Sequence, residues 1–211
     1  MIRITVGIDT SQFETRLRQL SEGQQARAMA NALNKTAERA RTASVRDITK
    51  DFALTATEVR NRLEVRRAFS KGRARIEAGI RIGGKRGMNL IRFVEKSVTL
   101  AQARRRMRAG EGGTMTLRTG GRVQKALQLR VKVRRQGGWK VIPGAFIGNN
   151  GRTVFRRIGT GRLPIEGVTT IDVPQLMLSE IGQSNFRKAV TDAFPNLLRH
   201  EIGRLIKGYG T

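Results

Sequence analysis

The sequence predicts an α+β fold: an antiparallel β-sheet or small β-sandwich with a basic outer face, packed by N-terminal and C-terminal helices. Three observations lead to this class. Apolar residues recur every three or four positions toward both ends of the chain, as on one face of a helix. In the centre they recur every second position, as in half-buried strands. Residues 66–162 hold 26 Lys and Arg against three acids, which is +23 of the formal net charge of +26.

The chain of 211 residues is long enough to bury a core. We expect one domain, residues 1–211, in three parts: a strand with helices (1–70), a basic β-rich core (71–162), and a turn with C-terminal helices (163–211). The absence of cysteine excludes disulfides and thiolate metal sites. No apolar run reaches 18 residues, so we expect no contact with a membrane interior.

The N-terminal part begins with an alternating segment, residues 1–8, which is typical of a strand. Ser11 and Glu14 have the spacing of a capping box and predict a short helix to about residue 20. Small residues at helical spacing predict a long helix over 24–51. A second capping box at Thr55 and Glu58 predicts a helix to about residue 69.

In the central part of the chain, apolar residues recur at every second position. Three segments read as strands, 73–82, 88–94 and 127–134, with aliphatic side chains on one face and arginines or lysines on the other. Residues 103–122 contain five glycines and six arginines with almost no periodicity, and we interpret them as a long Arg/Gly-rich loop.

Turn signals follow. Pro143-Gly144 is typical of a type II turn, which needs a positive φ at the glycine. Asn150-Gly151 predicts a hairpin that pairs residues 145–149 with 152–158. The last part predicts helices over 184–192 and 196–207, with Pro195 either beginning the second helix or kinking a continuous one.

The sequence contains no pattern that indicates catalysis. The only histidine, His200, reads as an ordinary helix residue, and the acids are not spaced for acid–base work or metal binding. No phosphate-binding glycine loop of the nucleotide-binding type is present. We therefore expect no enzymatic activity, no metal and no cofactor.

The basic residues indicate instead a polyanionic partner contacted through phosphates and without sequence reading. A solvated charge run is the alternative, but several predicted strands carry the same sign on their outer faces. The candidate contacts are the basic residues of these strands and of the long loop: Arg73, Arg75, Arg81, Arg104, Arg105, Arg106, Arg108, Arg130, Lys132, Arg134, Arg135, Arg156 and Arg157.

Three aromatic residues lie close together in the sequence, Trp139, Phe146 and Phe155. They could stack on nucleic-acid bases, but core packing or a subunit interface is the more common role. We interpret them with the neighbouring turns as a structural or interface motif of eight residues: Trp139, Pro143, Gly144, Ala145, Phe146, Phe155, Leu163 and Pro164.

The order of these features resembles the minor tail protein Z, or tail completion, family of long-tailed, lambda-like bacteriophages. The resemblance runs over residues 25–207. It rests on an ALN segment (Ala32–Asn34) in a helical region, a basic β-rich middle, and the sequence VIPGAFI at 141–147. A segment RIGTGRLPIEGV and a C-terminal helix follow. The first 20 residues lie outside this pattern.

The resemblance implies a non-enzymatic virion protein at the head-proximal neck of the tail, made in the host cytoplasm, which completes the tail and helps to join it to the head. It implies a homo-oligomeric ring, expected to be hexameric, next to tail tube or tail terminator proteins and head–tail connector proteins. The viral DNA end is the expected polyanion, and no membrane is involved.

Two other functions remain open from the sequence. Charge alone equally fits a free-standing, sequence-nonspecific nucleic-acid-binding protein, which would bind DNA and ignore phage tails. A nuclease of the neck region would need carboxylates and histidines arranged for metal chemistry, which the sequence does not display.

Overall fold

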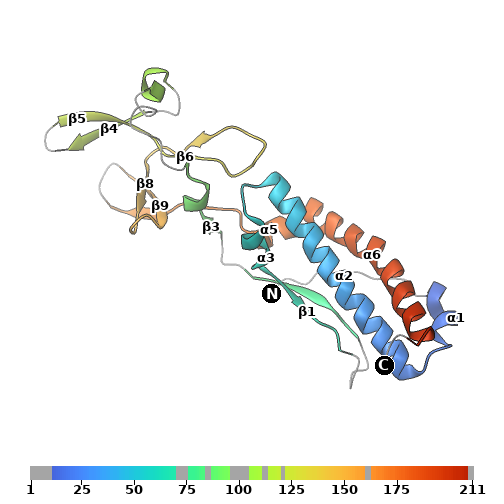
Figure 1. Cartoon of the computed structure of the whole chain (residues 1–211). Coiled ribbons are helices and arrows are strands. Elements are labelled where there is room, and N and C mark those ends of the chain that lie inside the picture. The colour runs from blue at the N-terminus through green and yellow to red at the C-terminus, as the bar shows by residue number, and fades with distance from the viewer. Residues whose placement is uncertain are drawn as a thin grey trace. The chain divides into compact units, whose positions relative to one another are not determined.

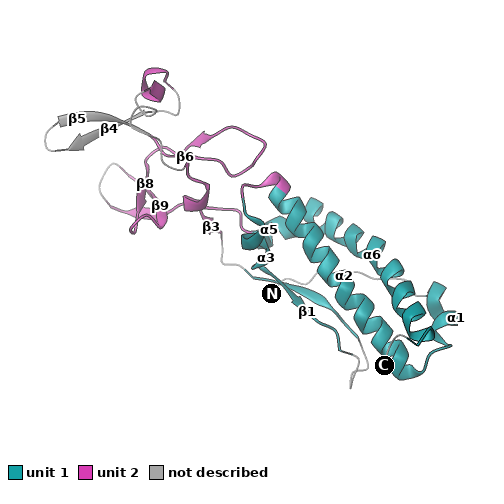
Figure 2. Ribbon diagram, viewed as in Figure 1, with its two compact units in different colours: residues 1–49, 54–84, 173–211 teal, residues 50–53, 85–172 magenta. Residues whose placement is uncertain are grey.

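The computed structural model describes residues 11–69, 76–83, 87–95, 105–110, 114–119, 122–159 and 163–208. They form two compact units (Figure 2). Unit 1 comprises residues 1–49, 54–84 and 173–211, and unit 2 comprises residues 50–53 and 85–172. Helices predominate toward both ends of the chain and the strands pair antiparallel, which confirms the α+β class. The expected strand at residues 1–8 lies outside the described residues.

Unit 1 is built on two long helices that run side by side, α2 (Glu22–Asp51) and α6 (Glu180–Ile206) (Figure 1). Alanines on α2 let the two backbones approach closely, because a small side chain keeps little distance between helix axes. A short 3₁₀ turn, η1 (Ser11–Phe13), and helix α1 (Glu14–Leu17) complete this end. The shared core consists of Phe13, Leu20, Ala28, Ala32, Phe194, Leu197, Leu198, Ile202 and Leu205.

Two predictions for the helices need correction or refinement. The predicted capping box at Ser11 does not begin helix α1: α1 begins after Phe13, which makes no side-chain cap. The predicted helix over 24–51 is confirmed. The two predicted C-terminal helices are one, because α6 continues through Pro195, and the short helix α5 (Val173–Leu178) precedes it.

The segment after α2 begins as predicted and then departs from it. Thr55 and Glu58 form the capping box of α3 (Ala56–Arg60), with Thr55 Oγ1 accepting from the Glu58 N–H at 3.3 Å. The helix ends at Arg60, however, and strand β1 (Leu63–Arg66) follows, so the predicted helix to residue 69 is wrong. The alternation of apolar and charged residues in LEVR favours a strand.

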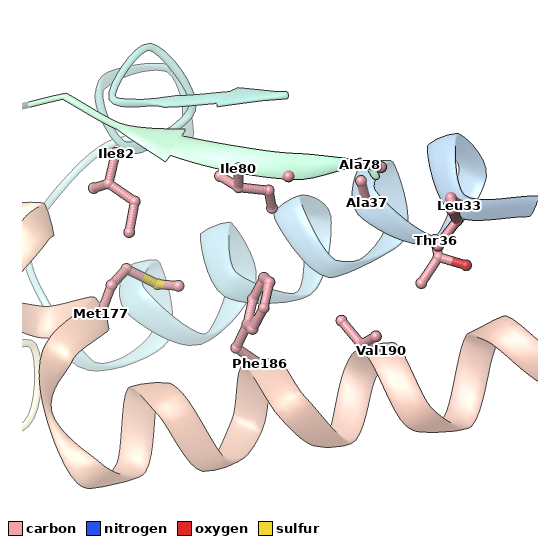
Figure 3. A pocket seen from close by; sticks show the side chains of 10 residues that line it. Leu33, Thr36, Ala37, Ala78, Ile80, Ile82, Met177, Phe186 and Val190 are labelled. Carbon is pink, nitrogen blue, oxygen red and sulfur yellow. The ribbon is translucent and has the colours of Figure 1, made fainter. Parts of the chain in front are cut away.

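Strand β1 pairs antiparallel with β2 (Gly79–Ile82), Leu63 opposite Ile82. Residues 78–82 alternate as predicted: Ala78, Ile80 and Ile82 line a pocket, whereas Arg81 is exposed (Figure 3). The pocket has a volume of about 110 Å³. Its other walls come from α2, α5 and α6: Leu33, Thr36, Ala37, Met177, Phe186 and Val190.

Asn34 fixes the chain after β1 to helix α2. Its Oδ1 accepts from the Ala68 N–H at 2.7 Å, and its Nδ2 donates to the Ala68 carbonyl at 3.1 Å. The side-chain amide of Asn34 therefore pairs with both the N–H and the carbonyl of the buried Ala68. In a sheet, a neighbouring strand would supply these two hydrogen bonds. This contact gives the asparagine of the ALN segment a structural role.

A buried carboxylate joins the two long helices. Glu201 of α6 is fully buried and accepts from Lys35 Nζ at 2.5 Å and from Asn31 Nδ2 at 3.4 Å, both on α2. Arg204, one turn later, donates to it at 2.9 Å. Burial by itself raises the pKa of Glu201, but the hydrogen bond and charge of Lys35, with the charge of Arg204 and the bond from Asn31, outweigh burial and lower the pKa below its ordinary value.

Unit 2 consists mainly of short strands and contains a 3₁₀ turn, η2 (Leu90–Phe93). Together with β1–β2 the strands make five separate antiparallel sheets in the described residues, where the sequence led us to expect one sheet or a small sandwich. The strands of unit 2 are β3 (Met88–Asn89), β4 (Thr114–Thr119), β5 (Arg122–Leu127), β6 (Arg130–Val131), β7 (Lys140–Val141), β8 (Ala145–Gly148), β9 (Thr153–Arg157), β10 (Ile165–Gly167) and β11 (Thr169–Thr170).

The predicted long loop and two predicted strands are corrected. Residues 103–122 contain a helical turn at 105–108 and the hairpin strand β4, which pairs with β5. The threonines of TMTLRT favour a strand, and the surrounding glycines obscured that signal. The expected strand 127–134 is interrupted after Leu127 and resumes as β6, and the expected strand 88–94 turns into η2 after Asn89.

The hairpin predicted from Asn150-Gly151 is confirmed. Strand β8 pairs with β9, and β9 also pairs with β10, so three strands form one sheet. Asn149, Asn150 and Gly151 all have positive φ in the connecting loop, as tight hairpin turns require. Gly144 has φ +69°, which agrees with the predicted turn at Pro143-Gly144.

Candidate polyanion-binding surface

The chain after α2 is attached to the segment that follows β6. The Ala53 N–H donates to the Val133 carbonyl at 2.8 Å, and the Arg135 N–H donates to the Asp51 carbonyl at 2.9 Å. These bonds place the side chain of Arg134 on the ring of Phe52, with 5.7 Å between the guanidinium carbon and the ring centroid. Arg134 is exposed, and its guanidinium therefore sits on a flat apolar support with its edge open to solvent.

Arg135 has a different role from its neighbour. Its Nε donates to the Phe52 carbonyl at 3.2 Å, so part of its hydrogen-bonding capacity is used within unit 2. Lys132 is half-buried, and its backbone N–H donates to the Phe93 carbonyl at 2.9 Å. Of these basic side chains, Arg134 is the one best placed for an external anion.

Glu95 forms ion pairs with two of the arginines that the sequence led us to expect as polyanion contacts. Arg106 NH1 lies 2.5 Å from Glu95 Oε1, and Arg130 Nε lies 3.9 Å from Glu95 Oε2. The carboxylate is only 15% exposed, so the two arginines compensate a charge that is largely removed from water. Arg130 also lies over the ring of Trp139 at 5.7 Å. Both arginines are therefore committed to the fold of unit 2.

The arginines on the two faces of the β8–β9–β10 sheet have different partners. Arg156 on β9 lies opposite Glu166 on β10, and its Nε and NH2 both donate to Glu166 Oε1, at 3.1 and 2.5 Å. Arg157 points to the other face, where its guanidinium carbon lies 4.8 Å from the centroid of the Phe146 ring. Arg156 is neutralised, whereas Arg157 is exposed and contacts no carboxylate within the described residues.

The aromatic residues of this sheet serve packing. The rings of Phe146 and Phe155 lie 6.0 Å apart between centroids and are tilted by 31°. Gly148 makes room for this pair, because a Cβ there would come within 3.0 Å of the Phe155 ring. Trp139 and Leu163 are exposed, at 39% and 71%. The part of the motif that lies in the sheet therefore forms the support on which Arg157 stacks.

The rest of the motif lies in the turns beside the sheet. The Ala145 N–H donates to the Ile142 carbonyl at 3.3 Å across Pro143-Gly144, and Ala145 is buried. At the other turn the Pro164 carbonyl accepts from the Ile158 N–H at 3.2 Å, and the Leu163–Pro164 peptide bond is cis.

The basic residues predicted to contact a polyanion therefore fall into different environments. Arg106, Arg130 and Arg156 are ion-paired, while Arg105, Arg108, Arg134 and Arg157 are exposed in unit 2 and contact no carboxylate among the described residues. Arg81 is also exposed and belongs to unit 1. Arg73, Arg75 and Arg104 lie outside the described residues.

Three residues that organise this surface were not predicted from the sequence: Phe52, Glu95 and Asn89. Asn89 Oδ1 accepts from the N–H groups of Ile91 and Val154, at 3.0 Å each, and so joins η2 to β9. A lone aromatic residue directly after a long helix, and a lone acid in a basic segment, are the only signals that the sequence offered for Phe52 and Glu95.

The described part of the chain offers neither a metal-binding cluster nor a membrane-spanning helix. It contains no cluster of three or more histidines or acids that could bind a metal ion. None of its helices combines the length and apolarity that a membrane span needs.

A family model described as prophage minor tail protein Z (GPZ) matches residues 11–209. No curated protein and no solved structure matches the chain significantly. The matched range includes both long helices and all of unit 2, that is, nearly the whole sequence. The chain therefore belongs to the prophage minor tail protein Z family.

Proposed function

We propose that this phage minor tail protein acts at the head-proximal end of the tail, where a ring of identical copies completes the tail and helps to join it to the head. Residues 1–211 act as one module without enzymatic activity. Its neighbours are tail tube or tail terminator proteins on one side and head–tail connector proteins on the other. A ring of this kind would gather many positive charges around a lumen, which a polyanion must offset.

The observation that supports a DNA contact is the set of exposed guanidinium groups of unit 2 that have no carboxylate partner in the described residues. Arg134 and Arg157 carry the proposal best, because each is stacked on a phenyl ring. Stacking restricts the side chain before binding, so less conformational entropy is lost when a phosphate is bound. Such contacts attract any DNA sequence, which suits the end of a packaged genome.

The tail assignment is tested by light scattering of the purified protein, alone and with purified tails from a phage of the same kind that lacks this protein. We expect a larger species of fixed stoichiometry on the tails, and tails treated in this way should regain the ability to join heads. A protein that ignores tails but coats duplex DNA would instead be the free-standing nucleic-acid-binding protein.

The DNA contact gives a separate prediction. A plot of log K against log salt concentration for a short duplex has a negative slope, to which each phosphate contact contributes about −0.9. The double variant Arg134→Gln/Arg157→Gln should therefore make this slope shallower by about 2. Fluorescence anisotropy over a salt series measures this slope. The matched control is Arg16→Gln/Arg187→Gln, which removes the same charge from exposed positions of unit 1. Equal slopes for the two double variants would contradict the assignment.

A further inference from the structure

A hollow on unit 1 carries two arginines with no carboxylate partner among the described residues, Arg39 and Arg67. It has a volume of about 790 Å³ and lies between α2, the chain after β1, and α6. The other charges that line it are already compensated: Lys35 binds Glu201, and Glu38 lies 2.8 Å from Arg41. Its full lining is Asn31, Asn34, Lys35, Glu38, Arg39, Arg67, Asn196, Leu197 and His200.

The chemistry of the hollow fits a protein segment better than DNA. Side-chain amides and the apolar Leu197 line it together with the two guanidinium groups, and a carboxylate, Glu38, sits among them. The carboxylate of Glu38 would repel the phosphates of a DNA duplex at this position. A protruding segment with one acid matches the two guanidinium groups in charge, and its apolar side chains can pack on the aliphatic parts of the lining side chains.

Such a segment exists on the same unit, at the corner between α5 and α6. Ile181 is the most exposed of the large hydrophobic residues in the described part of the chain, at 74%, and Leu178 is 46% exposed. Between them lies Glu180, which is exposed and has no cationic partner within the described residues. The corner is rigid: Ser179 Oγ accepts from the Gly182 N–H at 3.2 Å and donates to the Leu176 carbonyl at 2.7 Å.

The corner and the hollow of one molecule cannot meet. Glu180 and His200 lie on the same helix, 20 residues apart, which is about 30 Å along its axis. We propose that the corner at residues 178–181 of one copy docks into the hollow of the next copy, with Glu180 placed between Arg39 and Arg67. A contact of this head-to-tail kind, repeated around a closed circle, generates a ring. This inference rests on the ring formation proposed above and assigns its interface.

The first test uses charge reversal. Glu180→Arg, and separately Arg39→Glu/Arg67→Glu, should each lower the amount of tail-bound oligomer at least about tenfold at a fixed protein concentration, or about 1.4 kcal/mol. Combining all three changes restores the opposite charges and should restore assembly. The matched control is Glu22→Arg, an exposed acid in the first turn of the other long helix, which should assemble normally.

The second test uses the absence of native cysteine. A chain with Ile181→Cys and Arg67→Cys should give disulfide-linked ladders longer than dimers when oxidised on tails, whereas each single-cysteine chain should not. If the wild-type protein assembles on tails and neither charge reversal lowers the amount of oligomer, the proposed contact between copies is wrong, but ring formation itself is not contradicted. If only the Arg39→Glu/Arg67→Glu chain fails, the hollow binds a different tail protein, and the copy–copy contact is wrong. If wild type forms no oligomer on tails, the proposed ring itself fails.

Discussion

Replacing Lys35 by methionine is expected to lower the free energy of unfolding by about 2–3 kcal/mol at pH 7. Glu201 is fully buried, and its carboxylate depends on Lys35 for its shortest contact, 2.5 Å. Methionine keeps the length of the side chain but leaves the carboxylate with the hydrogen bonds from Arg204 and Asn31, and with His200 Nδ1 at 3.7 Å. Removing one partner of a fully buried pair usually costs about 3–5 kcal/mol, but the side chain of Lys35 is itself 52% exposed, so water screens part of its charge. The lower figure applies here because Arg204 still compensates part of the charge.

The loss should depend on pH in a defined direction. The folded protein holds the pKa of Glu201 below its ordinary value of 4.5. A carboxyl whose pKa is lowered by folding contributes stability above its unfolded pKa, and this contribution is lost as the pH falls through the folded pKa. Without Lys35 the largest influences that lower the pKa are gone, so the pKa of Glu201 rises. The difference between Lys35→Met and wild type should therefore shrink below about pH 4.5.

Urea unfolding at pH 7 and at pH 4 measures this difference. Lys188→Met is the matched control: it makes the same change at an exposed lysine of α6 that forms no ion pair in the described residues, and we expect little effect at either pH. An equal loss for Lys35→Met at both pH values would mean that packing, and not the charge of Glu201, explains the effect.

Local signals explain what could be predicted from the sequence. The long helix α2, the capping box at Thr55 and the hairpin at Asn150-Gly151 are each specified within a few residues, by helical spacing, by a side-chain cap and by residues that tolerate positive φ. The resemblance to the tail protein family likewise rested on contiguous motifs, and the family match over residues 11–209 confirms it.

Long-range contacts explain what could not be predicted. Glu201 reads as an exposed helix residue until α2 brings Lys35 to it across 166 positions of sequence. Likewise, nothing local distinguishes Arg156, which Glu166 neutralises, from Arg157, which stacks on Phe146. Alternation in a strand assigns a side chain to a face, but the partner on that face depends on which strands pair, and in this chain the strands separate into small sheets.

Two glycines of α6 should respond to alanine in opposite directions. At Gly182 a Cβ would lie 2.3 Å from the Leu176 carbonyl oxygen and 3.1 Å from both the Cα and the carbonyl oxygen of Met177. These are backbone atoms of the α5 end and cannot move aside without shifting α5 against α6. Overpacking of this kind costs about 1–3 kcal/mol. Alanine also brings a gain of about 1 kcal/mol to a helix, so the net effect of Gly182→Ala should be a loss of stability of up to about 2 kcal/mol.

Gly203 provides the control on the same helix. Beyond the adjacent backbone of α6 itself, no atom of the described residues lies within 4 Å of the position its Cβ would take. Gly203→Ala therefore keeps the helix propensity gain without a clash and should stabilise the protein by about 0.5–1 kcal/mol. Thermal unfolding of both variants separates the two effects. The Gly182 N–H also donates to the capping hydroxyl of Ser179. Gly182→Ala should therefore in addition displace Glu180 and Ile181 and weaken assembly on tails. Stabilisation by both alanines would mean that α5 is free to move away from α6, and the rigid corner that the proposed copy–copy contact needs would not exist.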